Sequence, residues 1–239
     1  MDPRQRLIVA LDVPTPEQAA RLVETLRGRV GMFKVGSQLF SAAGPTFVKG
    51  LTDGGQEVFL DLKYHDIPNT VAGAVAAAAR LGVSLVDVHA LGGRAMLEAA
   101  AGALRRDGGA ETRPPGARLL AITVLTSHAE ETLAELGLAG PIPSAVERLA
   151  RLARAAGAHG VVASPHEVAL IREACGPGFL IVTPGIRPAG ARAGDQQRLA
   201  TPRAAVAAGA DYVVVGRPIL EAPDPGAAAD AIVDELAQA

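Results

Sequence analysis

The sequence predicts a (β/α)8 barrel, an α/β fold in which eight parallel strands alternate with eight helices. Short apolar runs alternate with Ala-rich helical patterns along all 239 residues. Each run is apolar throughout, as expected for parallel strands that are covered on both faces. Eight such units favour a closed barrel over an open doubly wound sheet. Because no linker or low-complexity segment divides the chain, we expect one domain over residues 1–239.

The elements follow in a regular order. The predicted strands are RLIVALDV (6–13), MFKVG (32–36), EVFLDLK (57–63), LVDVHA (85–90), RLLAITVL (118–125), GVVAS (160–164), FLIVTPG (179–185) and DYVVVGR (211–217). The clearest helix patterns lie at 16–28, 67–82 and 143–157. Several begin near a Pro and end just before a Gly, which is the usual punctuation of a helix.

Two predicted connections are long. One runs from Thr126 to about Pro143, after the fifth strand, and the other from Arg187 to about Thr201, after the seventh. Such loops usually have about 2–6 residues, and longer ones are often functional. Both are expected at the carboxyl ends of the strands, where the active sites of barrels lie. A tolerated surface insertion is the alternative for each.

Composition excludes several classes of partner. The formal net charge is −2, aromatic residues make up 3%, and there is no Trp, so we expect no nucleic-acid binding. No apolar run approaches the roughly 20 residues of a membrane span, and the N-terminus lacks the apolar core of a signal peptide. Cys175 is the only cysteine, which fits a buried core residue in a reducing cytoplasm.

Charged residues at the ends of the first three strands give the strongest functional signal. Only three of 23 basic residues are lysines, yet Lys34 and Lys63 lie in apolar strands. A Lys ammonium can release a proton, whereas Arg cannot. Asp61 and Lys63 are two residues apart, so on an extended strand they share a face. With Asp12, we expect them to meet in the barrel mouth and hold each other ionised. A purely structural salt bridge is the alternative.

A second cluster follows the last two strands. TPGIRP comes after the seventh strand and GRP after the eighth, where barrels of this type often bind phosphate. Gly185 and Gly216 would let the backbone approach an anion closely. Arg187 and Arg217 add fork-shaped donors for phosphate oxygens, with a surface salt bridge as the alternative for Arg217. The sequence therefore predicts a small phosphorylated substrate whose reacting end lies on the second and third strands.

DLKYHDIPNTV (61–71) resembles the D-x-K-x-x-D signature of the orotidine 5'-phosphate decarboxylase family. Five further motifs occur in family order over nearly the whole chain: VALDV, FKVG, AITVLTS, TPGIRP followed by GDQ, and VVGRPI. The signature alone is shared with sugar-phosphate enzymes, but the set is specific and most similar to the bacterial form. The resemblance implies decarboxylation of orotidine 5'-monophosphate to UMP, the last step of UMP synthesis, with no metal or organic cofactor.

The resemblance also implies residue roles. Lys63 is the proton donor to C6 of the pyrimidine, and it forms an alternating charged array with Lys34, Asp61 and Asp66. Asp66 lies past the strand and is supplied by the partner subunit of a homodimer. The full set of implied substrate contacts is Asp12, Lys34, Asp61, Lys63, Asp66, Ile67, Thr70 (also from the partner), Thr126, Arg187, Gln196, Gly216 and Arg217. In this set Asp12 and Lys34 hold the ribose, Thr126 lies near the base, and the last four bind phosphate.

Other functions remain as alternatives. A magnesium-dependent sugar-phosphate decarboxylase or aldolase would use Asp61 and a neighbouring acid as metal ligands, although TPGIRP with GDQ and LTS argue against it. A metal-dependent epimerase would need His65 or His89. Without a second His on a matching strand, we expect His89 to be a hydrogen-bonded structural residue. We expect His65 either to pack against its neighbours or to support a residue of the site. A non-catalytic UMP sensor would have no need of Lys63.

Overall fold

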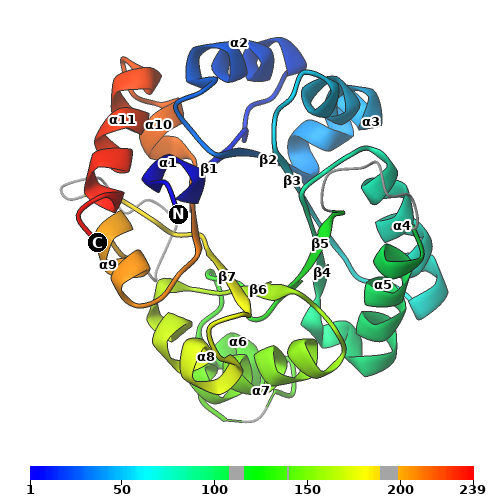
Figure 1. The fold of residues 1–239 in the computed structure, drawn as a ribbon. Helices are drawn as coiled ribbons and strands as arrows, with labels where there is room; N and C mark the ends of the chain where they lie inside the picture. The colour runs from blue at the N-terminus through cyan, green and yellow to red at the C-terminus, as the bar shows by residue number, and fades with distance from the viewer. Residues whose placement is uncertain (108–115, 139, 189–198) are drawn as a thin grey trace.

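The computed structural model describes residues 1–107, 116–138, 140–188 and 199–239, so Gln196 lies outside the described residues. Eight parallel strands form a closed barrel in chain order, with the last strand paired to the first (Figure 1). They are β1 (Leu7–Ala10), β2 (Met32–Gly36), β3 (Val58–Tyr64), β4 (Leu85–His89), β5 (Arg118–Ile122), β6 (Gly160–Val162), β7 (Leu180–Thr183) and β8 (Tyr212–Val215). The predicted (β/α)8 barrel is confirmed, although most strands are shorter than predicted.

Helices surround the barrel on all sides (Figure 1). The main ones are α2 (Pro16–Leu26), α3 (Ser37–Asp53), α4 (Pro68–Arg80), α5 (Gly93–Asp107), α7 (Ile142–Ala155), α8 (Val168–Cys175), α9 (Pro202–Ala207) and α11 (Pro225–Leu236). The expectation of eight helices is too low for the described ranges, because it misses α1 (Pro3–Arg6), α6 (Glu130–Glu135) and α10 (Arg217–Leu220), and the 3-10 turns η1 (Ala90–Gly92) and η2 (Pro165–Glu167). These elements are too short to show a helical period. Within the described ranges, no helix is long and apolar enough to cross a membrane.

Side-chain caps fix where several helices begin. Thr15, Thr201 and Asp224 each accept a hydrogen bond from a backbone N–H three residues later, at the start of α2, α9 and α11. Each cap is followed directly by Pro, whose missing N–H is not needed in the first turn. Residues in the loops after the strands thus set the entry of the following helix.

Two apolar layers explain the uninterrupted hydrophobic strands. A small cluster fills the barrel interior and comprises Ile8, Ala10, Met32, Phe59, Leu85, Leu120, Val182, Tyr212 and Val214. The alternate strand residues pack outward against the helices. Lys34 and Asp61 follow Met32 and Phe59 by two residues, so their side chains share the inward face. They therefore lie directly above the apolar filling of the barrel, at the carboxyl ends of β2 and β3.

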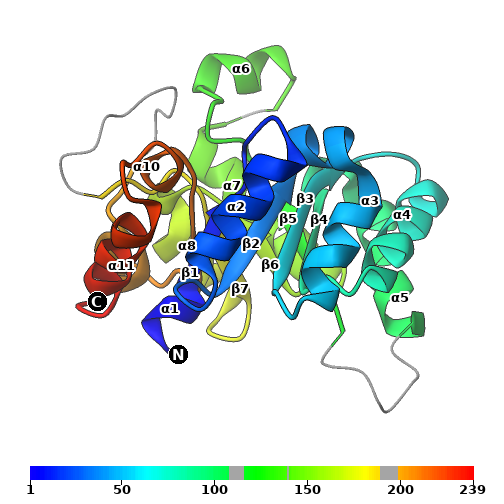
Figure 2. The same cartoon turned by 90° about the horizontal axis from the view of Figure 1, so that it is seen from above.

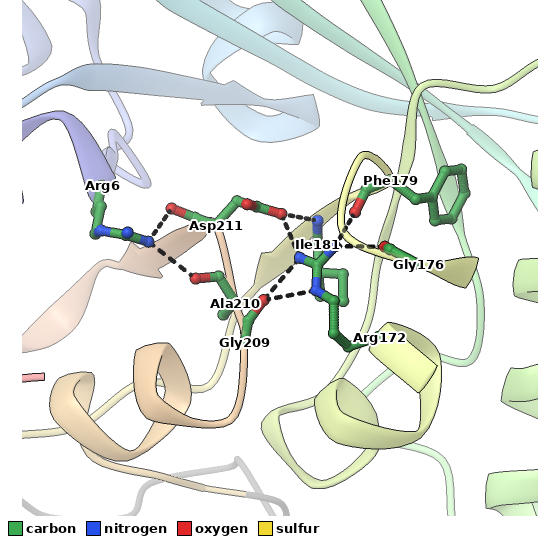
Figure 3. A network of polar contacts seen from close by, with 8 residues as sticks. All are labelled: Arg6, Arg172, Gly176, Phe179, Ile181, Gly209, Ala210 and Asp211. Carbon is green, nitrogen blue, oxygen red and sulfur yellow. Dashed lines mark hydrogen bonds and ion pairs between the residues drawn. The ribbon is translucent and has the colours of Figure 1, made fainter. Parts of the chain in front are cut away.

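A polar network lies at the amino-terminal ends of β7 and β8 (Figure 3). The Arg172 guanidinium donates to the carbonyl oxygens of Phe179 and Gly209, each at 2.7 Å, and pairs with Asp211 at 2.7 Å. The Asp211 carboxylate also accepts the backbone N–H of Ile181 at 2.8 Å. Arg172 lies in α8 and its partners precede or begin β7 and β8, so the network joins the amino-terminal ends of these two strands. Its role is structural, far from the carboxyl-end loops.

Candidate active site

A cavity of about 500 Å³ opens at the carboxyl ends of the strands. In Figure 2, α6 and α10, which follow β5 and β8, lie at this end of the barrel, and α1 lies at the other. The cavity brings together nine sequence-predicted residues: Asp12, Lys34, Asp61, Lys63, Thr126, Gly185, Arg187, Gly216 and Arg217. Asp12, after β1, and the charged residues of β2 and β3 line one part of the cavity, and the loops after β7 and β8 line the adjoining part, where Gly216 lies beside Asp12.

Lys34 is the centre of a chain of ion pairs. Its ammonium Nζ lies 3.2 Å from Asp12 Oδ1 and 3.0 Å from Asp61 Oδ2. Lys34 and Asp61 are buried, with exposed fractions of 8% and 7%. Gly36 makes room for the pair, since a Cβ at that position would lie 3.0 Å from Lys34 Nζ. A buried charge must be paired to be stable, and Lys34 has a carboxylate on each side.

Lys63 extends this chain, but in an unexpected backbone conformation. Its Nζ contacts Asp61 Oδ1 in a direct ion pair. Lys63 has a φ of 52°, and it is the single non-glycine residue in the described ranges with a positive φ. The pairing of β3 with β4 also shifts between Leu60 and Tyr64. Lys63 lies within β3, as predicted, but its backbone is not extended there. A local irregularity of the strand redirects its side chain, and the two side chains still meet.

The ion pairs stabilise the charged forms of Lys34 and Asp61. Burial alone would lower the pKa of Lys34, but the nearby charges of Asp61 and Asp12 raise it above its ordinary value. Burial alone would raise the pKa of Asp61, but chiefly the charge of Lys34, together with hydrogen bonding to Asp87 and the charge of Lys63, brings it well below its usual range. At neutral pH the site therefore contains an ionised Asp61 carboxylate paired with the Lys34 ammonium.

Asp87 is a further member of this cluster that the sequence analysis did not single out. It lies inside β4 and is fully buried. Its Oδ1 accepts the backbone N–H of Lys63 at 2.8 Å. Burial, followed by the charge of Asp61, raises the pKa of Asp87 well above its ordinary value. The available signal was an acid in the middle of the apolar run 85–90, but the sequence did not show what it contacts.

The loops after β7 and β8 contribute two glycines and two arginines to the cavity lining. Gly185 has a φ of 76°, a left-handed conformation that favours glycine. Arg187 follows it, and its Nη1 donates to the Ile186 carbonyl oxygen at 2.9 Å. Gly216 precedes α10, which begins at Arg217. Together these residues line one part of the cavity and place two arginines there.

Three predicted contacts do not line the cavity of their own chain. Asp66, Ile67 and Thr70 are exposed, and Ile67 has 68% of its surface accessible. The Asp66 carboxylate instead accepts the backbone N–H of Ile67 at 2.6 Å. They belong to the exposed segment after β3, outside the residues that line the cavity.

The histidines of this region differ in part from expectation. The His65 and His89 rings pack together with centroids 5.6 Å apart, so His65 is a packing residue. Within the described chain, Nδ1 of His89 is buried and has no hydrogen-bond partner, contrary to the hydrogen-bonded role expected for that residue. Burial and then the charge of His65 lower the pKa of His89. The described ranges contain no group of three or more His, Cys, Asp or Glu residues placed to hold a metal ion.

Fold and site together define a class of protein: a (β/α)8-barrel enzyme with an acid–base array at the carboxyl ends of its strands. Sequence comparison then identifies the family. A model described as the orotidine 5'-phosphate decarboxylase / HUMPS family matches residues 5–232, and the chain belongs to this family. The resemblance drawn from the sequence motifs is thus confirmed.

Named relatives agree with this assignment. The chain is 60% identical to orotidine 5'-phosphate decarboxylase of Halorhodospira halophila, over 98% of this chain and 97% of the relative. It is 56% identical to that of Syntrophotalea carbinolica, over 100% and 98%. The crystal structure of orotidine 5'-phosphate decarboxylase from Lactobacillus acidophilus superposes with a TM-score of 0.85 at 42% identity, covering 96% of this chain and 98% of the other.

Proposed function

We propose that this protein decarboxylates orotidine 5'-monophosphate to UMP without a metal or organic cofactor, and that Lys63 donates the proton to C6. The observation that carries the proposal is the chain of alternating charges that ends at the Lys63 ammonium in the cavity. Relatives at 53–60% identity are named orotidine 5'-phosphate decarboxylase, which favours this activity over a magnesium-dependent sugar-phosphate reaction. The single cysteine, which is buried, supports a cytoplasmic location.

The proposed reaction needs a fixed positive charge. When the bond between C6 and the carboxylate breaks, carbon dioxide leaves and the electron pair stays on C6, in the plane of the ring. No adjacent carbonyl can take up that pair. An ammonium beside C6 stabilises the developing charge and then transfers a proton to it, after which water reprotonates the amine. Asp61, which is held ionised, fixes the Lys63 ammonium in place through their ion pair.

The remaining residues are proposed to bind the rest of the substrate. Asp12 and Lys34 lie next to each other and would hold ribose hydroxyls. Thr126, in the loop after β5, would contact the base. The phosphate would lie against Arg187, Gly216 and Arg217, with Gln196 also assigned to it by the resemblance. Binding energy from the phosphate end would hold the pyrimidine against Lys63.

Arg217→Ala tests the phosphate assignment. A hydrogen bond to a charged group contributes about 1.5–3 kcal/mol, so we expect affinity for UMP to fall by roughly 10- to 100-fold. Affinity for uridine, which lacks the phosphate, should be unchanged. Titration calorimetry of both ligands with both proteins gives the comparison. Unchanged affinity of the variant for UMP would rule out a role for Arg217 at the phosphate.

The homodimer is proposed from the exposed segment after β3. Asp66, Ile67 and Thr70 lie at the surface, and Ile67 is among the few large apolar side chains exposed in the described residues, as is Leu91 after β4. Burial of such side chains against a second copy would be favourable. It would also bring the carboxylate of Asp66 to the partner's cavity.

Subunit mixing tests this arrangement. Lys63→Ala and Asp66→Ala should each be nearly inactive alone. In a hybrid dimer, one site would combine the intact Lys63 of one chain with the intact Asp66 of the other. Random reassortment should then restore roughly a quarter of wild-type activity. Each variant treated alone is the control. A mixture that stays as inactive as its components would place both residues in the same subunit's site.

The activity itself is tested by ultraviolet absorbance of orotidine 5'-monophosphate mixed with EDTA-treated protein. We expect the spectrum to change to that of UMP at the same rate as without EDTA, because the proposed chemistry uses a lysine in place of a metal. If the chelated protein is inactive and acts on a sugar phosphate once magnesium is restored, Asp61 is a metal ligand and the proposal is wrong.

A further inference from the structure

The backbone of Lys63 requires support. Its φ of 52° lies in the left-handed region, which is disfavoured for residues that have a Cβ. The strand pairing between β3 and β4 is interrupted at the same place, between Leu60 and Tyr64. The Lys63 side chain has to reach one position in the cavity. The hydrogen bonds between β3 and β4, however, do not fix the backbone of Lys63. Such local strain persists when surrounding groups determine the conformation.

Asp87 supplies the missing contact. From the adjacent strand β4, its Oδ1 accepts the Lys63 backbone N–H at 2.8 Å. Asp87 is 0% exposed, so this hydrogen bond is shielded from water. The acceptor is a side chain packed in the barrel interior, which has little freedom to move. The position of the Lys63 side chain therefore depends on Asp87.

The second oxygen of Asp87 indicates its protonation state. Within the described chain, Oδ2 is buried and no group donates a hydrogen bond to it. The carboxyl faces Asp61, and two adjacent buried carboxylates cannot both ionise without strong repulsion. Asp61 is held ionised by Lys34 and Lys63. A proton on Asp87 removes the repulsion and gives its carboxyl a donor toward Asp61.

We propose that Asp87 is a positioning residue that carries a proton shared with Asp61 and fixes the Lys63 backbone for proton donation. This inference rests on the proposed function. Burial and the charge of Asp61, which together raise the pKa of Asp87, support it.

The neighbouring ionisable groups are consistent with this role. β3 contributes Asp61, Lys63 and Tyr64, and the pKa of Tyr64 is raised chiefly by burial. His89 lies two residues further along β4. On the other side, β5 contributes Arg118, whose guanidinium donates instead to the Tyr212 hydroxyl. Lys63 is thus the cation on these elements that acts on Asp87, and its effect is smaller than that of Asp61.

Two substitutions distinguish a protonated carboxyl from an ionised one. Asp87→Asn keeps an acceptor for the Lys63 N–H and a donor toward Asp61, so kcat should stay within about threefold of wild type. Asp87→Val removes both, and kcat should fall by about 10- to 100-fold while KM changes less than threefold, because misplacement of a catalytic group reduces the rate. Val86→Ala, a buried change on the outward face of β4, is the control for general loosening of the strand. It should retain wild-type kcat.

The pH profile supplies the second readout. In the wild type, kcat should decline as pH rises and Asp87 loses its proton, and in Asp87→Asn this decline should move to higher pH. The inference is overturned if Asp87→Val keeps wild-type kcat, if Asp87→Asn is as slow as Asp87→Val, or if the decline is unchanged in Asp87→Asn. Wild-type protein that does not act on orotidine 5'-monophosphate would instead overturn the proposed function, so the two failures are distinct.

Discussion

Lys63→Ala is expected to lower kcat on orotidine 5'-monophosphate by at least about 10⁴-fold and to change affinity for UMP by less than about tenfold. The substitution removes both the charge beside C6 and the proton that C6 receives. It leaves the Arg187 and Arg217 side of the cavity intact, so product binding should persist. Single-turnover absorbance and calorimetric titration with UMP measure the two quantities separately.

Lys49→Ala is the matched control for the loss of a lysine. Lys49 lies on α3 with 47% of its side chain exposed and pairs with Asp53 four residues later. Removing it should change neither kcat nor UMP affinity, because exposed pairs of this kind contribute little. If Lys63→Ala lowers catalysis and UMP binding by the same factor, Lys63 is a binding residue and its chemical role is disproved.

The second large effect is expected for Asp61→Asn, which should lower both stability and activity. Lys34 is buried, and this change removes the carboxylate 3.0 Å from its ammonium. Breaking a buried ion pair costs about 3–5 kcal/mol of unfolding free energy. Lys63 also loses its ion-pair partner, so kcat should fall by roughly 10²- to 10³-fold. Chemical denaturation and steady-state kinetics give the two values.

Asp53→Asn provides the same substitution at an exposed Asp–Lys pair. Asp53 has 62% of its side chain accessible, and its loss should change the unfolding free energy by at most about 1 kcal/mol. A similar small change in Asp61→Asn would mean that the carboxylate is not needed to balance the buried charge of Lys34.

The shifted pKa of Asp61 also predicts an acid dependence. Because folding lowers this pKa, the carboxylate contributes stability above its unfolded pKa of about 3.9 and loses that contribution as pH falls toward the folded value. Asp87 has the opposite sign: its pKa is raised, so its contribution is present below about 3.9 and is lost as pH rises through the folded value. In chemical denaturation, Asp61→Asn should therefore flatten the loss of stability as pH falls below about 4.

The fold was predictable because the same pattern, an apolar strand followed by a helix, recurs along the chain. Each strand is apolar on both faces and each connection contains a helical pattern, so an error at one element does not change the architecture. The array was predictable for a related reason. Lys34 and Asp61 are charges in strands that otherwise contain only apolar residues, and such charges require partners. The structure places those partners within 3.2 Å of the Lys34 ammonium.

Other features depend on geometry that a sequence pattern does not contain. The rule that residues two apart on a strand share a face assumes an extended backbone, so it does not predict the positive φ at Lys63. Asp87 is two residues before His89 in an apolar run, but its contact with the Lys63 N–H follows from the shifted pairing of β3 and β4. The short helix α6 likewise lies in a connection whose length, and not its structure, was predictable.

Exchange of deuterium from [6-²H]UMP into ordinary water tests the central claim most directly. If the Lys63 ammonium donates a proton to C6, the neutral amine must remove one from C6 in the reverse direction, by microscopic reversibility. We expect the wild-type protein at stoichiometric concentration to replace the deuterium with hydrogen, and Lys63→Ala, with UMP bound, to leave it in place. Exchange in Lys63→Ala at the wild-type rate would show that another group moves the proton, and Lys63 would not be the donor.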